Sequence, residues 1–106
     1  SNLLSTFEFS ETEKAKNIFD FLNDDEELVK LFDNIPSDKL SIKIGTEIGI
    51  ELLDDCSIVA SSYHVDGNNA GRILVLGPKR MNYGAIVSTV NYISNTLSDV
   101  FSGIYL

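Results

Sequence analysis

Two groups of charged residues in this 106-residue chain are candidates for a binding or a catalytic site. Lys79 and Arg80 directly precede a helical pattern, and the N–H groups at a helix start together with two cations could hold a phosphate or a carboxylate. The second group consists of four carboxylates in one short connection: Glu47, Glu51, Asp54 and Asp55. Carboxylates can act as general acids and bases, or as oxygen ligands of Mg²⁺ and Ca²⁺.

Each group also has an ordinary structural use. Arg80 could pair with an acidic residue of the 46–55 connection, because a guanidinium in an acid-rich chain readily finds a carboxylate. Acidic residues are common on solvated loops, and these four lack the tight spacing of a motif such as the EF-hand loop. The anion site at Lys79 and Arg80 and its ion-pair alternative both stay open, and we expect no metal site.

The single histidine and the single cysteine do not extend this chemistry. His64 and Cys56 lie on one expected strand, ~26 Å apart at the rise of a strand, so they cannot act together as base and nucleophile. One histidine and one cysteine also cannot supply a Cys/His zinc site. We expect no catalytic residue, no cofactor and no enzymatic activity, and the lone cysteine suits a reducing cytoplasm.

A strand–turn–helix unit positions the two cations. Residues 72–77 predict a strand, and Pro78 ends it because proline has no N–H for the ladder. Asn82 is a good helix N-cap, since its side-chain oxygen can accept a hydrogen bond from the first turn. Apolar residues then recur every three or four positions through 82–101, which predicts a long amphipathic helix with Gly103 just beyond its end.

The preceding chain supplies further helices and strands. We expect a short strand at 3–9, a helix from a Ser10–Glu13 capping box to a break at Asn23-Asp24, a second helix ended by Pro36, strands at 40–44 and 56–65, and a hairpin loop at 66–71. In 40–44 the apolar residues alternate with Ser41 and Lys43, which predicts a half-buried strand. The chain is expected to be a single α+β domain over residues 1–106, an antiparallel sheet flanked by helices in the order (β)-α-α-β-β-β-α.

Composition and charge narrow the function classes. Apolar residues make up 43% of the chain, and no apolar run approaches the ~18 residues that a membrane span needs. No secretory signal pattern is visible, so we expect a cytoplasmic protein with no membrane partner. The net charge is −8, with −9 over residues 1–55 and +1 over residues 56–106. An acidic chain of this kind is not expected to bind DNA tightly, because DNA binding requires clustered lysine and arginine residues.

Three segments of the chain resemble one protein family. They are Ile42-Lys-Ile-Gly-Thr-Glu47, Leu53-Asp-Asp-Cys-Ser-Ile-Val-Ala60 and Leu76-Gly-Pro-Lys-Arg-Met-Asn-Tyr83. Their order and spacing resemble the C-terminal part of the bacterial heat-inducible transcription repressor family HrcA. The positions that match its signature are Gly45, Glu47, Gly77, Pro78, Arg80, Met81 and Tyr83. The family usually has threonine and aspartate where this chain has Lys79 and Asn82.

The resemblance implies a GAF-like fold and a regulatory role. In the HrcA family a full-length homodimer represses chaperone operons at an inverted-repeat operator, CIRCE, through an N-terminal winged-helix domain that this chain lacks. The chaperonin GroEL modulates that repression. The implied partners are therefore GroEL, a second copy in the full-length protein, and operator DNA only through the missing domain. The alternative is a GAF-type small-molecule sensor, which predicts a polar-lined pocket between the sheet and the helices.

Overall fold

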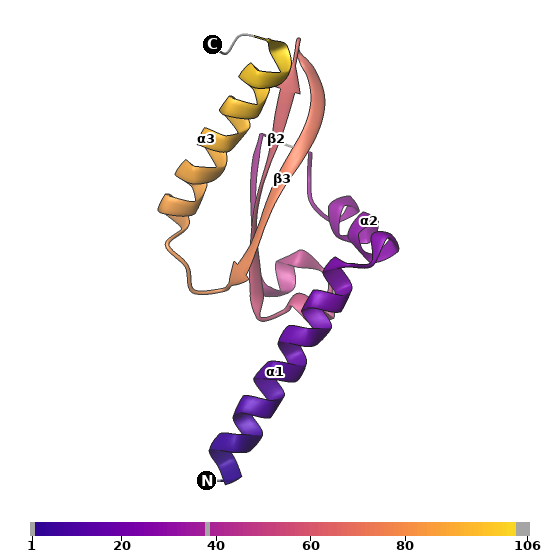
Figure 1. Cartoon of the computed structure of the whole chain (residues 1–106), viewed down its shortest axis with the longest axis vertical. Helices are drawn as coiled ribbons and strands as arrows, with labels where there is room; N and C mark the ends of the chain where they lie inside the picture. Colours follow the sequence, from indigo (N-terminus) through magenta and orange to yellow (C-terminus); the bar gives the residue numbers. More distant parts are fainter. Residues whose placement is uncertain (1, 38, 104–106) are drawn as a thin grey trace. The chain divides into compact units, whose positions relative to one another are not determined.

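The chain folds into two compact units, Ser1–Asn34 and Ile35–Leu106, in a computed structural model. The structure describes residues 2–37 and 39–103, with side chains from residue 11 onward. The first unit is helical, and the second holds an antiparallel sheet and one long helix (Figure 1). The predicted α+β class is confirmed, and this architecture is compatible with a GAF-like fold.

Helix α1 (Asn2–Leu22) opens the first unit and corrects the expected start of the chain. A strand at 3–9 and a helix start at Ser10 are both wrong, because the backbone is α-helical throughout this stretch. Leu3 and Phe7 are four residues apart, which is helical spacing, so a short apolar alternation cannot distinguish the two structures. The following residues are rich in Glu, Lys and Ala, whose helix propensity favours one continuous helix.

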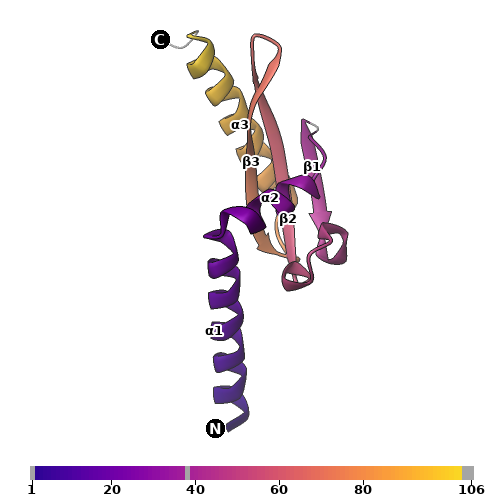
Figure 2. The same cartoon turned by 90° about the vertical axis from the view of Figure 1, so that its right-hand side faces the viewer.

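Helix α2 (Asp25–Asp33) follows the predicted break and takes a different direction from α1 (Figure 2). Its N-cap is Asp24, whose side chain accepts hydrogen bonds from the backbone N–H groups of Glu26 at 3.0 Å and Glu27 at 3.3 Å. Three acidic residues occupy the first turn, where the helix macrodipole favours negative charge. Leu31 on this helix is fully buried.

Three antiparallel strands in the order β1-β2-β3 form the sheet of the second unit. They are β1 (Leu40–Ile44), β2 (Cys56–Val65) and β3 (Asn68–Pro78) (Figure 2). The predicted bounds of β1 and β2 are confirmed, whereas β3 begins four residues earlier than expected. Two 3₁₀ turns, η1 (Gly45–Ile48) and η2 (Glu51–Leu53), form the connection between β1 and β2.

The β2–β3 hairpin turns on two residues, Asp66 and Gly67, instead of the six-residue loop expected at 66–71. Both have positive φ, 54° and 81°. Two consecutive residues of this conformation form the tight turn that matches the twist of a hairpin, and an Asp-Gly pair is among its preferred sequences. The strands therefore stay paired up to the turn, which lengthens β3 at its start.

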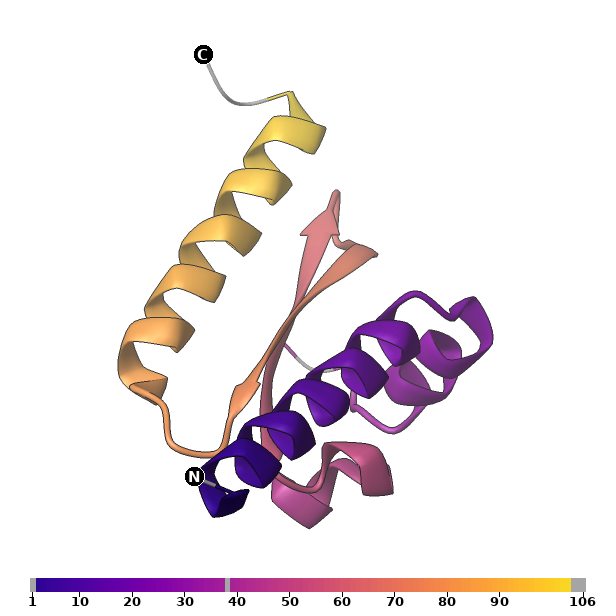
Figure 3. The same ribbon diagram turned by 60° about the horizontal axis from the view of Figure 1, so that its bottom comes forward.

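Helix α3 (Tyr83–Ser102) runs alongside the β2–β3 hairpin (Figure 3). The side chain of Asn82 accepts a hydrogen bond from the N–H of Ala85 at 3.1 Å, and this confirms the predicted N-cap. Gly103 follows the helix with a φ of 72°, as expected for its C-terminal glycine. No helix of the described residues combines the length and the hydropathy needed to cross a membrane.

The apolar side of β1 faces the same way as α3 but lies outside its cover. Ile42 lies directly opposite Val59 on β2, and opposed residues of an antiparallel pair project to one face of the sheet. Ser61, two residues further along β2, shares this face and accepts a hydrogen bond from Ser94 of α3. Because α3 packs mainly on β2, Ile42 is still 39% exposed. The expected strand is correct, but its apolar side is more open than its alternation suggests.

The core of the second unit is centred on β2, the middle strand. The first seven residues of β2 are all buried, on both faces of the sheet. Ile58 and Val59 are fully buried, and so is Val90, which α3 contributes. Cys56 is buried as well, which is common for a free cysteine.

Candidate functional site

Most of the positions singled out by the family resemblance lie at one end of the sheet, where β1 and β3 end. Gly45 follows β1 with a φ of +62°, a conformation that favours glycine. A Cβ atom added there would lie 3.2 Å from the carbonyl oxygen of Asp54 and 3.3 Å from the Cδ atom of Lys79. Glu47 then accepts a hydrogen bond from the N–H of Ile44 at 2.7 Å. Gly45 and Glu47 therefore shape the turn η1 beside the end of β3.

Further contacts connect the end of β3 with the start of α3. A Cβ atom at Gly77 would lie 2.4 Å from the Sδ atom of Met81, so the missing side chain leaves room for the methionine. Ser57 on β2 donates a hydrogen bond to the carbonyl oxygen of Pro78 at 2.7 Å. The hydroxyl of Tyr83 donates to the carbonyl oxygen of Lys79. These contacts build the corner that starts α3, and we call it the signature corner: Gly45, Glu47, Gly77, Pro78, Met81 and Tyr83.

Replacing Gly77 with alanine is expected to lower the free energy of unfolding by about 1–2 kcal/mol, because the new methyl group and the Met81 sulfur cannot occupy one place. Urea denaturation measures the change. The penalty should largely disappear when Met81→Ala is combined with it, since the double variant removes the clash. Gly84→Ala is the matched control: its nearest atom would lie 3.7 Å away, and alanine should stabilise the helix by up to about 1 kcal/mol. Equal effects of the two alanines would contradict this account.

Lys79 and Arg80 are exposed on this corner. The expected ion pair of Arg80 with the 46–55 connection is not found among the described residues, and neither is one of Lys79. At the start of α3, the side chain of Asn82 already accepts from the N–H of Ala85. An anion site at the two cations stays a prediction.

The four carboxylates of the connection do not form a cluster. Asp54 is half-buried, and Glu47, Glu51 and Asp55 are exposed. Glu47 is already used by its hydrogen bond to the backbone of Ile44. Within residues 2–37 and 39–103, no group of three or more His, Cys, Asp or Glu side chains could hold a metal ion.

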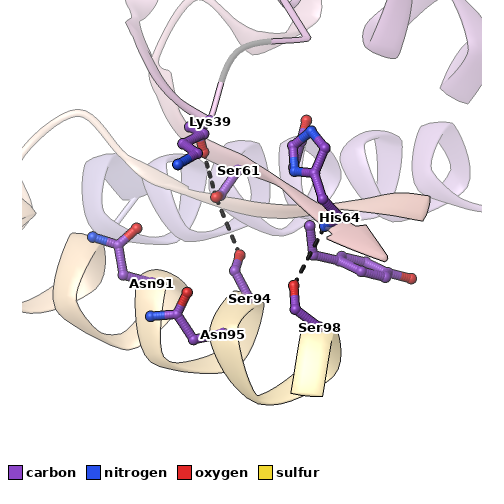
Figure 4. A pocket seen from close by; sticks show the side chains of 9 residues that line it. Lys39, Ser61, His64, Asn91, Ser94, Asn95 and Ser98 are labelled. Carbon is purple, nitrogen blue, oxygen red and sulfur yellow. Dashed lines mark hydrogen bonds between the residues drawn. The ribbon is translucent and has the colours of Figure 1, made fainter. Parts of the chain in front are cut away.

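A polar pocket lies between α3, β2 and the residue that precedes β1 (Figure 4). Its volume is ≈ 230 Å³. The lining residues all carry polar side chains and define what we call the α3–β2 pocket: Lys39, Ser61, Ser62, Tyr63, His64, Asn91, Ser94, Asn95 and Ser98. Of these residues, only His64 was considered from the sequence, as a strand residue too far from Cys56 to act with it.

A chain of hydrogen bonds forms the floor of this pocket. Ser94 donates to the hydroxyl of Ser61 at 3.1 Å, and Ser61 donates to the carbonyl oxygen of Lys39 (Figure 4). Ser98 accepts a hydrogen bond from the backbone N–H of His64 at 3.3 Å. The imidazole of His64 points away from α3, so this residue lines the pocket with its backbone (Figure 4).

A sequence signal for the pocket does exist. Asn91, Ser94, Asn95 and Ser98 are spaced by three, four and seven residues along α3, so they form one polar stripe on the helix. This stripe lies beside the apolar stripe that predicted the helix. A polar stripe on an amphipathic helix ordinarily faces water, and only the packing of α3 on β2 places this one over a sheet.

The sequence matches a known family. The family model described as "HrcA protein C terminal domain" matches residues 1–87. The heat-inducible transcription repressor HrcA of Moorella thermoacetica is 38% identical over 104 residues, which are 98% of this chain and 30% of that protein. The protein of the same name from Listeria monocytogenes is 34% identical over 105 residues, 99% of this chain and 30% of its own length. The chain spans about three-tenths of the curated relatives it matches.

A solved structure has the same fold. It is titled "Crystal structure of a hypothetical protein at 2.2 A resolution", and it matches with a TM-score of 0.74 at 22% identity. The match covers 88% of this chain and 28% of that one, and at this identity it concerns the fold alone. The family is decided by the sequence match, which includes the signature corner and confirms the resemblance. The chain belongs to the HrcA family of heat-inducible transcription repressors and is their C-terminal domain.

Proposed function

We propose that this chain is the regulatory domain of a repressor that, as a full-length homodimer in the cytoplasm, silences chaperone operons at the CIRCE operator. The observation that carries the proposal is the family match over residues 1–87. In this proposal the two compact units act as one domain, and the operator is bound only by the missing N-terminal part of the repressor. The net charge of −8 supports that division, because DNA binding requires clustered cations.

The chaperonin GroEL is the proposed regulator. A partner that binds the DNA-competent state more tightly than the other state raises operator occupancy, and removing the partner lowers it. Unfolded proteins that occupy GroEL would therefore release the chaperone operons. No catalytic step is needed for this mechanism, since it depends on binding equilibria alone.

The outer flank of α3 is the proposed contact surface for the chaperonin. Ile93 and Val100 are 39% and 38% exposed, and their separation of seven residues places them on one face of the helix. Phe101, the residue after Val100, is 59% exposed and stacks on Tyr63 of β2 with ring centroids 6.0 Å apart. Apolar side chains that are exposed close together on one helix are candidates for a protein–protein contact.

The test measures operator occupancy of the full-length repressor by gel mobility shift. Added GroEL should raise the occupancy, and GroEL saturated with an unfolded protein should not. The double variant Ile93→Ser, Val100→Ser should lose the response. Tyr92→Ser is the matched control, because Tyr92 is 73% exposed on the neighbouring position of the same helix, outside the patch. Operator occupancy that does not change when GroEL is added would refute the chaperonin link. An equal loss of the GroEL response in the double variant and in Tyr92→Ser would refute the contact surface.

A second candidate function is a small-molecule sensor. The observation that favours it is the polar α3–β2 pocket, which such a sensor is expected to contain. In this proposal a bound metabolite changes the position or the mobility of α3 and thereby the DNA affinity of the full-length dimer. A metabolite that binds the repressor and leaves its operator affinity unchanged would refute the sensing function.

A further inference from the structure

We propose that the α3–β2 pocket binds a small metabolite that carries an oxyanion, either a carboxylate or a phosphate. This inference rests on the sensor proposal and gives it a ligand class. The pocket lies wholly within the second unit, between residues 39 and 98. The residues that line the pocket are not those of the proposed chaperonin contact, so separate variants can test the two proposals.

The charge of the lining favours an anion. None of the lining residues is acidic, although the whole chain contains 16 acidic residues and 8 basic ones. Lys39 supplies a cation at one side of the pocket. A cation beside polar donors attracts an oxyanion, and hydrogen bonds to a charged partner are about twice as strong as neutral ones.

Hydrogen-bond donors remain available on α3. The hydroxyl of Ser98 accepts from the N–H of His64, so its own hydrogen is free to donate. The side-chain amides of Asn91 and Asn95 have no hydrogen-bond partner among the described residues, and each amide carries two N–H donors. These groups lie on successive positions of one helical stripe. Neighbouring members of this stripe can donate to the oxygens of an anionic group, with Lys39 as the cation of the lining.

The floor of the pocket is already ordered. Ser61 and Ser94 are buried, and each uses its hydroxyl hydrogen within the chain of hydrogen bonds that ends on the backbone of Lys39. This chain fixes the backbone of Lys39 against β2. A site whose groups are held before binding loses less entropy when the ligand arrives.

The size of the pocket limits the ligand. A volume of ≈ 230 Å³ corresponds to about eight waters at roughly 30 Å³ each. Drug-sized ligands occupy pockets of about 300–1,000 Å³, so this pocket suits a smaller molecule. Malate and glycerol 3-phosphate are close to the required size, and they represent the carboxylate and the phosphate source.

The experiment titrates malate, glycerol 3-phosphate and the uncharged control glycerol into the ¹⁵N-labelled 106-residue chain and into the full-length repressor. Backbone amide shifts identify the binding surface. We expect at least one of the two anions to saturate shifts at Asn91, Ser94, Asn95 and Ser98, and glycerol not to do so. Saturation by one anion alone identifies the carboxylate or the phosphate as the recognised group.

Two variants test whether the lining residues of the pocket bind the anion. Lys39→Gln should weaken binding at least about tenfold, because it removes one charge-assisted contact. Lys43→Gln is its matched control: it removes the same charge from β1, on the face of the sheet opposite to α3, and should leave the affinity unchanged. Asn95→Asp places a negative charge in the pocket and should also weaken binding at least about tenfold.

Each other outcome overturns the proposal. Equal affinities of the Lys39→Gln and Lys43→Gln variants would show that the ligand is held by non-specific charge attraction and not by Lys39. Saturable binding of glycerol would show that the pocket does not require an anionic group. Absence of shifts in the full-length repressor would show that the pocket is closed in the whole protein. None of these results affects the GroEL test, and a metabolite that binds without changing operator occupancy would refute only the sensing function.

Discussion

Replacing Val90 with aspartate is expected to lower the free energy of unfolding of the second unit by at least about 4 kcal/mol, because it places a carboxylate in a site without a partner. Val90 is fully buried and is the apolar residue of α3 with the least exposure. Domains of this size are stable by roughly 5–15 kcal/mol, so a loss of this magnitude removes most of the folded population at moderate temperature. The expected observation is a thermal transition that is shifted down by more than about 15 °C or lost.

Tyrosine fluorescence measures this change in the second unit alone. All four tyrosines lie within residues 35–106, and the chain has no tryptophan. Tyr92→Phe serves as the reference for the fluorescence signal. Thr89→Asp is unsuitable as a charge control because Thr89 donates a hydrogen bond to the carbonyl oxygen of Ala85, and Ser102→Asp is unsuitable because Ser102 ends α3. Asn91→Asp is the matched control, since it adds the same charge at the neighbouring position, which is exposed. A Val90→Asp variant as stable as Asn91→Asp would show that α3 does not pack on β2.

Replacing Ile58 with alanine is expected to cost about 3–4 kcal/mol, whereas Ile42→Ala should cost only about 1 kcal/mol. The two isoleucines lie on neighbouring strands of one sheet, so both variants lose the same side-chain atoms. Ile58 is fully buried in the middle strand, and Ile42 is 39% exposed on β1. The difference between the two variants therefore reflects the deeper burial of Ile58 together with its place in the middle strand.

Urea denaturation followed by tyrosine fluorescence gives both values. Equal costs would mean that the apolar side of β1 is as well covered as β2, which would contradict the position of α3. The alternation in β1 correctly places its apolar residues on one side, but it says nothing about how far a helix extends over that side.

Several local features of this protein follow from the sequence because short-range interactions decide them. Asn82 starts α3 and Gly103 follows its end, since a cap needs only its own side chain or its own φ and the adjacent turn. Pro78 ends β3 because it lacks an N–H. The bounds of β2 follow from a long apolar and β-branched run.

The start of the chain shows where local patterns are ambiguous. Residues 3–9 fit a strand by two alternating aromatic residues and fit a helix by the spacing of Leu3 and Phe7. The hydrogen bonds of a helix that continues on the C-terminal side decide such a case, because adding a residue to an existing helix is easier than starting one. A window of seven residues does not contain that information.

The family, the α+β class and the order of the elements after the first helix can be predicted from the sequence, because motif spacing and hydrophobic periodicity are properties of the chain alone. The contacts of the signature corner and of the polar stripe of α3 depend on how distant segments pack. Gly77 leaves space for Met81, and Gly45 meets residues far along the chain, through contacts that no local pattern specifies. The α3–β2 pocket exists because α3 packs on β2 with its polar stripe turned toward Lys39, and packing between distant segments depends on the whole fold.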